Sequence, residues 1–269
     1  LPIDKIRDFA GEVDKLYVIE ELEPYMEDQI KAAGIQCVGK ELIPITGELN
    51  PDIIAEAILG KKPPVIEYDK GILANRPPTL CAGCPHRGFF YQLAKTKDIM
   101  ITSDIGCYGL GGSDPLNAKD TRICMGGGVG MGHGAQKIFN KFNEGMRTVS
   151  IMGDSTFFHT GINGVLNAVF NNSNTIICIL DNRITGMTGH QENPGTGFTL
   201  QGDPTVIVDI PNLVKALGVK NIKVVNPLKL NEVKDAVDWA LGNDEVSVII
   251  TRWPCVLKKQ TEKIGRAHV

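Results

Sequence analysis

The stretch that decides the fold of this chain is GDSTFFHTGINGVLNAVFNNSNTIICILDN, residues 153–182. One apolar run, TVSIMG, leads into its start, and a second, TIICIL, ends at Asp181-Asn182. The residues between them leave room for one helix, over about 160–172, that crosses between two adjacent parallel strands. Both polar ends would then lie at the carboxyl edge of the sheet, where open α/β sheets bind ligands.

These polar ends supply the oxygen atoms that a divalent cation prefers. Asp154 offers a carboxylate, Asn182 offers an amide oxygen, and the backbone just after Asn182 can offer a carbonyl. Such groups bind Mg²⁺ or Ca²⁺, and waters and ligand phosphates usually complete a Mg²⁺ shell. Gly153, Ser155 and Thr156 let the backbone approach a phosphate at the helix start. The alternative is a strand-end aspartate and a turn asparagine in an ordinary α/β domain.

This spacing resembles the signature of thiamine diphosphate (TPP) enzymes, in which Gly-Asp-Gly is followed, after about two dozen residues, by Asn-Asn. Here Ser155 stands in the third position of the first motif, and Asp181 replaces the first asparagine of the second. The pair Asp154 and Asn182 is retained. The resemblance therefore implies a TPP-binding domain with its metal ion.

Composition argues against several other classes of function. The chain has 269 residues and a formal net charge of −3, which suits one large or two modest domains. No basic patch stands out, so nucleic-acid binding has no support. No apolar run has membrane-spanning length and the start lacks a charged-then-apolar leader, so we expect a soluble, cytoplasmic protein without membrane contact. Both ends interrupt recognisable patterns, and we expect a longer parent chain.

The patterns along the chain predict an α/β fold, with a doubly wound, mostly parallel sheet preceded by a partial small α/β segment. Proline, glycine and charge from KKPP to NRPP mark a linker between the two. The expected parts are 1–62, which resembles the C-terminal part of a transketolase C-terminal-like α/β domain; 63–78, the linker; 79–257, the TPP diphosphate-binding domain that the TPP signature implies; and 258–269, a tail.

Individual elements follow from the same patterns. In the first part we expect helices over 3–12 and 24–34, a strand LYVIEE over 16–21, and a helix that opens at Asn50-Pro51. In the second part we expect strands at 98–104, 148–153, 175–180, 222–227 and 246–251. Helices are expected at 85–95, 127–142, 160–172, 209–217 and 230–241. Continuously apolar strands that alternate with helices are typical of a parallel sheet covered on both faces.

The chain has seven cysteines, which without signs of secretion are more often metal-binding, catalytic or buried than disulfide-bonded. Cys81 and Cys84 form a Cys-x-x-Cys pair, which alone fits a redox pair, half a zinc site or part of an iron–sulfur site. Cys107 and Cys255 each follow a predicted strand, so four thiolates would meet at one edge of the sheet. The alternative is that Cys107 and Cys255 are small buried residues. Cys178 lies mid-strand and is expected in the core.

A glycine-rich turn, DTRICMGGGVGMGHGAQK over 120–137, precedes a predicted helix of small residues. Small residues permit close approach, so we expect the first turn of this helix to lie against the flat part of a cofactor. Cys124, Met125 and Gly126 are the expected contacts, with a packing role as the alternative for Cys124. Among the histidines, His86 follows Cys84 and Pro85 and is the candidate catalytic residue that faces the reacting carbon of a substrate.

Five segments together resemble the α subunits of indolepyruvate:ferredoxin oxidoreductases, members of the 2-oxoacid:ferredoxin oxidoreductase superfamily. They read CAGCPHRGFF, SDIGCYGLGG, CMGGGVGMGHG, GDSTFFHTGINGVLNAVFNN and DNRITGMTGHQENPG. The resemblance implies an enzyme that oxidatively decarboxylates aryl pyruvates such as indolepyruvate to acyl-CoA, with ferredoxin as electron acceptor. It also implies a smaller β subunit, an oligomeric assembly and a ferredoxin-like segment beyond the tail.

The same resemblance assigns roles to particular residues. They are the Mg²⁺ ligands Asp154, Asn182 and the backbone carbonyl of Ile184; the TPP contacts Gly106, Cys107, Gly153, Ser155, Thr156 and Thr185; and the ligands of a [4Fe–4S] cluster, Cys81, Cys84, Cys107 and Cys255. A purified fragment can lose such a cluster.

Forming the reactive TPP carbanion requires a glutamate from a pyrimidine-binding domain, for which the chain offers no candidate. We therefore expect this chain to bind Mg²⁺ and diphosphate but not to turn over alone. Two other functions stay open from the sequence. One is a non-oxidative TPP-dependent 2-oxoacid decarboxylase, which needs no thiolate quartet. The other is a non-catalytic α/β fragment whose thiols bind a structural metal.

Overall fold

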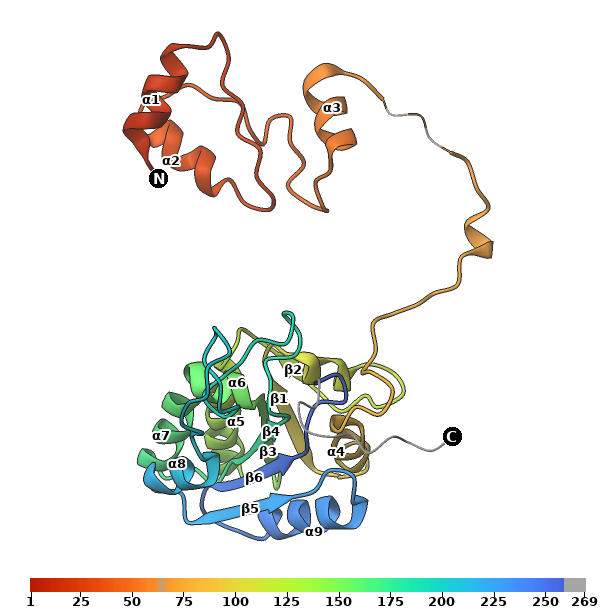
Figure 1. The fold of residues 1–269 in the computed structure, drawn as a ribbon, viewed down its shortest axis with the longest axis vertical. Coiled ribbons are helices and arrows are strands. Elements are labelled where there is room, and N and C mark those ends of the chain that lie inside the picture. The colour runs from red at the N-terminus through yellow and green to blue at the C-terminus, as the bar shows by residue number, and fades with distance from the viewer. Residues whose placement is uncertain (63, 65, 259–269) are drawn as a thin grey trace. The chain divides into compact units, whose positions relative to one another are not determined.

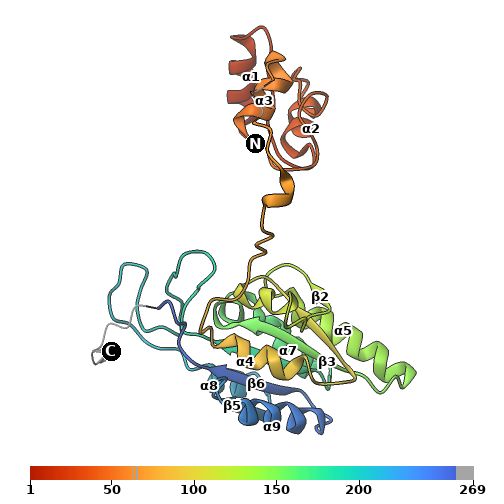
Figure 2. The same ribbon diagram turned by 90° about the vertical axis from the view of Figure 1, so that its right-hand side faces the viewer.

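The chain divides into two compact units, Leu1–Asn75 and Arg76–Val269, drawn from two directions in Figures 1 and 2. The computed structural model describes residues 1–62, 64 and 66–258. The domain boundaries expected at 62, 78 and 257 stay predictions. The predicted tail, 258–269, lies outside the described residues except for Lys258.

The C-terminal unit is built on one six-stranded sheet with the order β2-β1-β3-β4-β6-β5. Every pairing in this sheet is parallel, which confirms the predicted fold class. The strands are β1 (Ile99–Ser103), β2 (Thr121–Arg122), β3 (Arg147–Gly153), β4 (Ile176–Asp181), β5 (Asn221–Val225) and β6 (Ser247–Arg252). Five of them match predicted strands, whereas the sequence analysis missed the two-residue strand β2.

Helices cover both faces of this sheet (Figure 1). They are α4 (His86–Leu93), α5 (Gly127–Phe142), α6 (Asp154–Thr156), α7 (Ile162–Phe170), α8 (Ile210–Ala216) and α9 (Leu230–Leu241), with a 3-10 helix at Cys107–Gly112 and a π-helical turn at Phe157–Gly161. The five predicted helices of this unit are therefore confirmed. The predicted crossover is also confirmed, because α7 lies between β3 and β4 in sequence and these strands are parallel neighbours.

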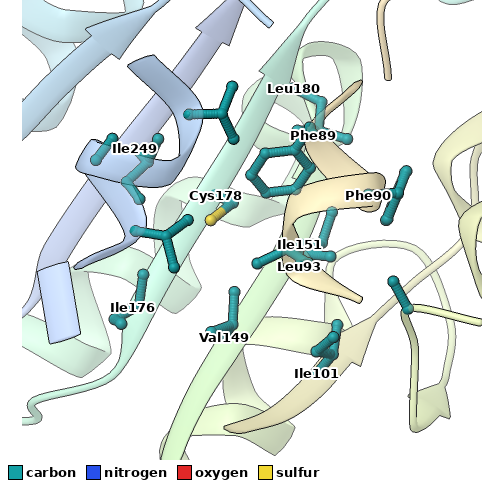
Figure 3. Close-up of a cluster of buried hydrophobic side chains, with 14 of the residues drawn as sticks. Phe89, Phe90, Leu93, Ile101, Val149, Ile151, Ile176, Cys178, Leu180 and Ile249 are labelled. Carbon is teal, nitrogen blue, oxygen red and sulfur yellow. The ribbon is translucent and has the colours of Figure 1, made fainter. Parts of the chain in front are cut away.

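Alternate residues of β4 explain how one strand serves two cores. Ile176, Cys178 and Leu180 belong to the cluster that packs under α4 and α9 (Figure 3). Ile177 and Ile179 belong to the other cluster, under α5, α7 and α8. Since side chains alternate across a strand, burial on both faces requires the continuous apolar run that the sequence shows. Cys178 is fully buried in this strand, as predicted.

The N-terminal unit contains α1 (Ile3–Gly11), α2 (Tyr25–Ala32), α3 (Pro51–Leu59) and a short 3-10 helix at Lys70–Ile72. The three predicted helices are confirmed, and the Asn50 side chain caps α3 by accepting the Ile53 N–H at 3.0 Å. The predicted strand over 16–21 is wrong. Only Tyr17 makes a bridge there, parallel to Val38, and two short segments alone cannot form a stable sheet.

Among the helices that the structure describes, none has both the length and the hydrophobicity needed to span a membrane.

Candidate metal and cofactor site

The ends of β3 and β4 bring the two predicted metal ligands together. Gly153 is the register partner of Leu180, so the residues just beyond these strands emerge side by side. The Asn182 side-chain amide ends 3.3 Å from Asp154 Oδ1 and 2.7 Å from the carbonyl oxygen of Ile184. The three groups expected to hold Mg²⁺ therefore converge on one point.

The orientation of the Asn182 amide decides what this point can bind. Its oxygen faces both acceptors, with one distant donor, the Ile184 N–H at 3.4 Å. If the amide were rotated, its nitrogen would donate to both acceptors. The three oxygens can therefore lie this close together either after that rotation or with a cation bound among them. The Asn182 Nδ2 lies 3.5 Å from His86 Nε2, and a neutral imidazole that accepts there favours the orientation with oxygen toward Asp154.

Burial makes the Asp154 carboxylate dependent on a positive partner. The residue is 2% exposed, and within the described part of the chain its Oδ2 has no hydrogen-bond partner. Burial, and then the charge of Asp181, raise the Asp154 pKa to about 7, against a partial lowering by the Ser155 N–H. A buried carboxylate oxygen without a partner is costly. The donor set and this orphaned oxygen fit a divalent cation.

Asp181, which stands in the first position of the Asn-Asn motif, does not join this cluster. Its carboxylate pairs with Arg183 Nε at 3.3 Å and with Arg252 Nε at 2.7 Å. Arg183 itself has a φ of +61°, a left-handed conformation that costs energy in a residue with a side chain. The turn between Asn182 and Ile184 thus depends on an unfavourable backbone conformation that its neighbours must hold.

A cavity of about 100 Å³ lies against these oxygens. Eleven residues of the predicted site line it: His86, Gly106, Cys107, Met125, Gly153, Asp154, Ser155, Thr156, Asn182, Ile184 and Thr185. The Thr185 hydroxyl donates to Ser155 Oγ at 2.9 Å, which places two of the expected diphosphate contacts in one hydrogen-bonded pair.

The structure does not bring the other two expected cofactor contacts to this cavity. Cys124 is exposed and is absent from the residues that line the cavity. Gly126 has a φ of +85° and donates its N–H to Asp104 Oδ2 at 2.9 Å. Its neighbour Met125 is the residue of this turn that reaches the cavity wall.

Sequence reasoning missed Tyr108, which lines the same cavity. Its hydroxyl contacts the Asp104 carboxylate and lies 2.8 Å from Thr156 Oγ1. A Cβ on Gly153 would lie 2.8 Å from the Tyr108 ring, so the ring explains this glycine without any phosphate. Burial raises the pKa of Asp104 to about 6, although its hydrogen bonds from Tyr108 and Gly126 oppose the shift.

Asn193 was also missed. It is buried in the loop that follows β4. It opposes the rise in the Asp154 pKa, although its Nδ2, like Asp154 Oδ2, has no hydrogen-bond partner among the described residues. No periodicity marks such a loop residue, so only the path of the folded loop reveals it.

The four expected cluster ligands line a second cavity, of about 270 Å³: Cys81, Cys84, Cys107 and Cys255. Burial is the main cause that raises the pKa of Cys84, to about 11, and that of Cys107. Thiols held this way in a common cavity fit a group that supplies positive charge, because ligating thiolates must be deprotonated.

Over the residues that the structure describes, no three His, Cys, Asp or Glu side chains are placed to hold one metal ion.

The two cavities share part of their walls, including His86, Cys107 and Asn182. His86 is 3% exposed, and burial lowers its pKa to about 4, so the imidazole is neutral near pH 7. The predicted catalytic histidine thus lies between the oxygen cluster and the thiols.

Comparison with known proteins shows the family to which this domain is similar. Residues 104–251 match the family described as "Thiamine pyrophosphate enzyme, C-terminal TPP binding domain". The chain is 38% identical over 277 residues to the indolepyruvate oxidoreductase subunit IorA of Archaeoglobus fulgidus, covering 96% of this chain and 43% of that protein. It is 37% identical to the IorA subunit of Pyrococcus abyssi, covering 99% of this chain and 46% of that protein.

A solved structure shows a similar fold. It is the 2-oxoglutarate:ferredoxin oxidoreductase from Magnetococcus marinus with 2-oxoglutarate, coenzyme A and succinyl-CoA bound, with a TM-score of 0.57 and 18% identity. The alignment covers 68% of this chain and 66% of that one. The chain spans less than half the length of the curated relatives it matches. The family match extends over more than half of the chain, so the chain belongs to the thiamine pyrophosphate enzymes and carries their C-terminal TPP-binding domain.

Proposed function

We propose that this chain is the TPP- and Mg²⁺-binding part of an oxidoreductase that oxidatively decarboxylates aryl pyruvates, indolepyruvate among them, to acyl-CoA. Ferredoxin is the proposed electron acceptor, and a smaller β subunit and an oligomeric assembly are part of the proposal. The observation that carries it is the oxygen cluster of Asp154, Asn182 and Ile184 beside a cavity lined by four cysteines. The names of the relatives support the choice of substrate.

In this proposal the chain's residues bind and orient the cofactor. Asp154, Asn182 and the Ile184 carbonyl hold Mg²⁺, and the hydroxyls of Ser155 and Thr185 bind diphosphate oxygens. When bound, TPP supplies the carbanion and the electron sink for 2-oxoacid chemistry. His86, neutral because it is buried, fixes the Asn182 amide and offers a hydrogen bond on the thiol side of the site.

The thiol cavity favours an oxidative reaction over a non-oxidative decarboxylation. A non-oxidative decarboxylase transfers no electrons to an external acceptor and therefore needs no thiolate quartet. An oxidoreductase needs an electron acceptor near the cofactor. Cys107 lines both cavities, which supports a cluster beside the TPP site in this proposal. The seven cysteines are free, which supports a reducing, cytoplasmic location.

Calorimetric titration of TPP in the presence of Mg²⁺ tests the cofactor assignment. We expect wild type to bind, and Asp154→Ala to lose at least ~100-fold in affinity, because the remaining metal ligands are neutral oxygens. Asp235→Ala, which removes an exposed carboxylate on α9, is the matched control and should bind like wild type. Equal binding by Asp154→Ala and wild type would contradict the metal assignment.

Iron and sulfide analysis after anaerobic reconstitution tests the cluster. We expect about four irons per chain in wild type, as a [4Fe–4S] cluster requires. Cys107→Ser should lose most of this iron, whereas Cys124→Ser, at an exposed cysteine outside the cavity, should retain it. Stoichiometric zinc in place of iron and sulfide would favour the structural-metal alternative.

A further inference from the structure

The turn that carries Asn182 is tied to the segment that carries Cys255. After β4 and β6 end, main-chain hydrogen bonding continues between them: the Trp253 N–H donates to the Asp181 carbonyl at 3.1 Å, and the Cys255 N–H donates to the Asn182 carbonyl at 2.9 Å. The Lys258 ammonium adds a third bond between the two segments, because it donates to the Arg183 carbonyl at 2.9 Å. A displacement of one segment must therefore displace the other.

An ion pair joins the ends of β4 and β6, directly before these main-chain hydrogen bonds. Asp181 and Arg252 are register partners at the ends of β4 and β6, and Arg252 Nε lies 2.7 Å from Asp181 Oδ2. The Asp181 side chain is 1% exposed, while that of Arg252 is 29% exposed. A carboxylate this buried needs its partners, and the pair fixes the two strand ends side by side.

The pair also bears on the unfavourable backbone at Arg183. Asp181 Oδ1 lies 3.3 Å from Arg183 Nε, and the same guanidinium donates from Nη1 to the Gly195 carbonyl at 2.9 Å. These contacts hold the side chain of the residue whose φ is +61°. That conformation sets the Ile184 carbonyl and the Asn182 amide at 2.7 Å from each other.

We propose that Asp181 and Arg252 are positioning residues that hold the metal-binding turn and, through the two main-chain bonds beyond them, set the position of Cys255 relative to Asn182. Neither residue lines either cavity. The metal half of this inference rests on the proposed function, whereas the thiol half does not. Because coupling between two sites is reciprocal, ordering the turn with Mg²⁺ and TPP also restrains the Cys255 segment.

Titration of Mg²⁺ at saturating TPP tests the first half by calorimetry. Asp181→Asn and Arg252→Gln should each weaken Mg²⁺ binding by ~10-fold or more, the usual effect of losing a group that orients metal ligands. The double variant should be no weaker than the worse single variant, because both act through one pair. Asp181→Asn leaves two partly exposed arginines that can hydrate, so it tests the idea even where Arg252→Gln unfolds.

Arg147→Gln is the matched control for a purely structural loss. Arg147 is another partly buried arginine of the sheet, but it lies at the start of β3 and donates to the Leu241 and Asn243 carbonyls. We expect it to lower the melting temperature without changing Mg²⁺ affinity. Wild-type affinity in Asp181→Asn, or an equal loss in Arg147→Gln, would overturn the positioning role.

Alkylation of the ligand-free protein tests the second half, with mass spectrometry to follow each cysteine. In Asp181→Asn the rate at Cys255 should rise several-fold relative to Cys81, which lines the same cavity but has no bond to the turn. The ratio should stay unchanged in Arg147→Gln. An unchanged ratio in Asp181→Asn would refute the link to Cys255. Since this measurement uses no metal or TPP, it decides the link even if wild type fails to bind them.

Discussion

Asp154 shows how a binding site can oppose folding at the level of one residue. Its folded pKa of about 7 stands above its ordinary value of 3.8 because the carboxyl is buried. An acid whose pKa is raised by folding binds its proton more tightly in the folded state. Its contribution to stability is therefore lost as the pH rises from about 4 to 7, and above pH 7 the metal-free protein carries the whole cost.

Asp154→Asn should therefore stabilise the metal-free protein at pH 8 while it abolishes Mg²⁺ binding. We expect a gain on the order of 3 kcal/mol in the free energy of unfolding at pH 8, and almost none at pH 4. Urea denaturation at both pH values measures it. The raised pKa of Asp104 acts in the same direction but is common to both proteins and cancels in the comparison. Equal stability at pH 8 would show that burial of this carboxylate is not costly.

Spacing along the sequence was enough to predict the meeting of Asp154 and Asn182, because parallel neighbouring strands end at the same edge. The positions of Tyr108 and Asn193 could not be predicted, since they depend on how loops fold back over that edge. The ion pair of Asp181 could not be predicted from the sequence either. Its partner Arg252 lies 71 residues away, and only the register of β4 against β6 makes them neighbours.

At the level of elements, a glycine of α5 can be required by contact with a cofactor or by contact with the sheet. A Cβ on Gly132 would lie 2.0 Å from Ser150 Oγ and 2.8 Å from Thr102 Oγ1. The helix and the sheet touch here, and the Thr102 hydroxyl donates to the Gly128 carbonyl at 2.8 Å. The sequence prediction assigned only the first turn of this helix to a cofactor and gave no reason for Gly132. The structure shows that Gly132 is required by the sheet.

Two alanine substitutions on α5 should therefore have opposite effects. Gly132→Ala should cost about 1–3 kcal/mol, because it forces the helix away from β1 and β3. Gly130 is exposed with nothing within 4 Å of its Cβ position, and Gly130→Ala should gain about 0.5–1 kcal/mol from helix propensity. Thermal or urea unfolding of both variants measures the difference. A similar change in both would mean that propensity, not the contact, governs Gly132.

The elements that sequence could predict are those whose pattern is independent of neighbours. Strands β3, β4 and β6 are buried on both faces, and continuous apolar runs mark them. LYVIEE carries a similar apolar pattern, yet it forms only the single Tyr17–Val38 bridge, since a strand exists only if another segment hydrogen-bonds to it. Strand β2 is hydrogen-bonded in the sheet but was not predicted, because two residues are too few to show a hydrophobic period.

For the whole molecule, the two units differ greatly in how much they bury. Among the described residues of the N-terminal unit, four buried apolar residues form a cluster, Val18, Ile30, Ile35 and Cys37, and Ile43 is buried outside it. The C-terminal unit has two larger clusters, one on each face of its sheet. Stability grows with the apolar area removed from water, so the N-terminal unit should be the weaker of the two.

We therefore expect two transitions in scanning calorimetry, and a ligand effect on the second alone. Mg²⁺ and TPP bind the folded C-terminal unit in our proposal, and at 100 times the dissociation constant they add about 2.7 kcal/mol, which raises its melting temperature by roughly 5–10 °C. Ile30→Ala should lower only the first transition, and Asp154→Ala should abolish the ligand shift of the second. A single transition that the ligands move as a whole would mean that the units unfold together, and a shift that survives in Asp154→Ala would place the ligands elsewhere.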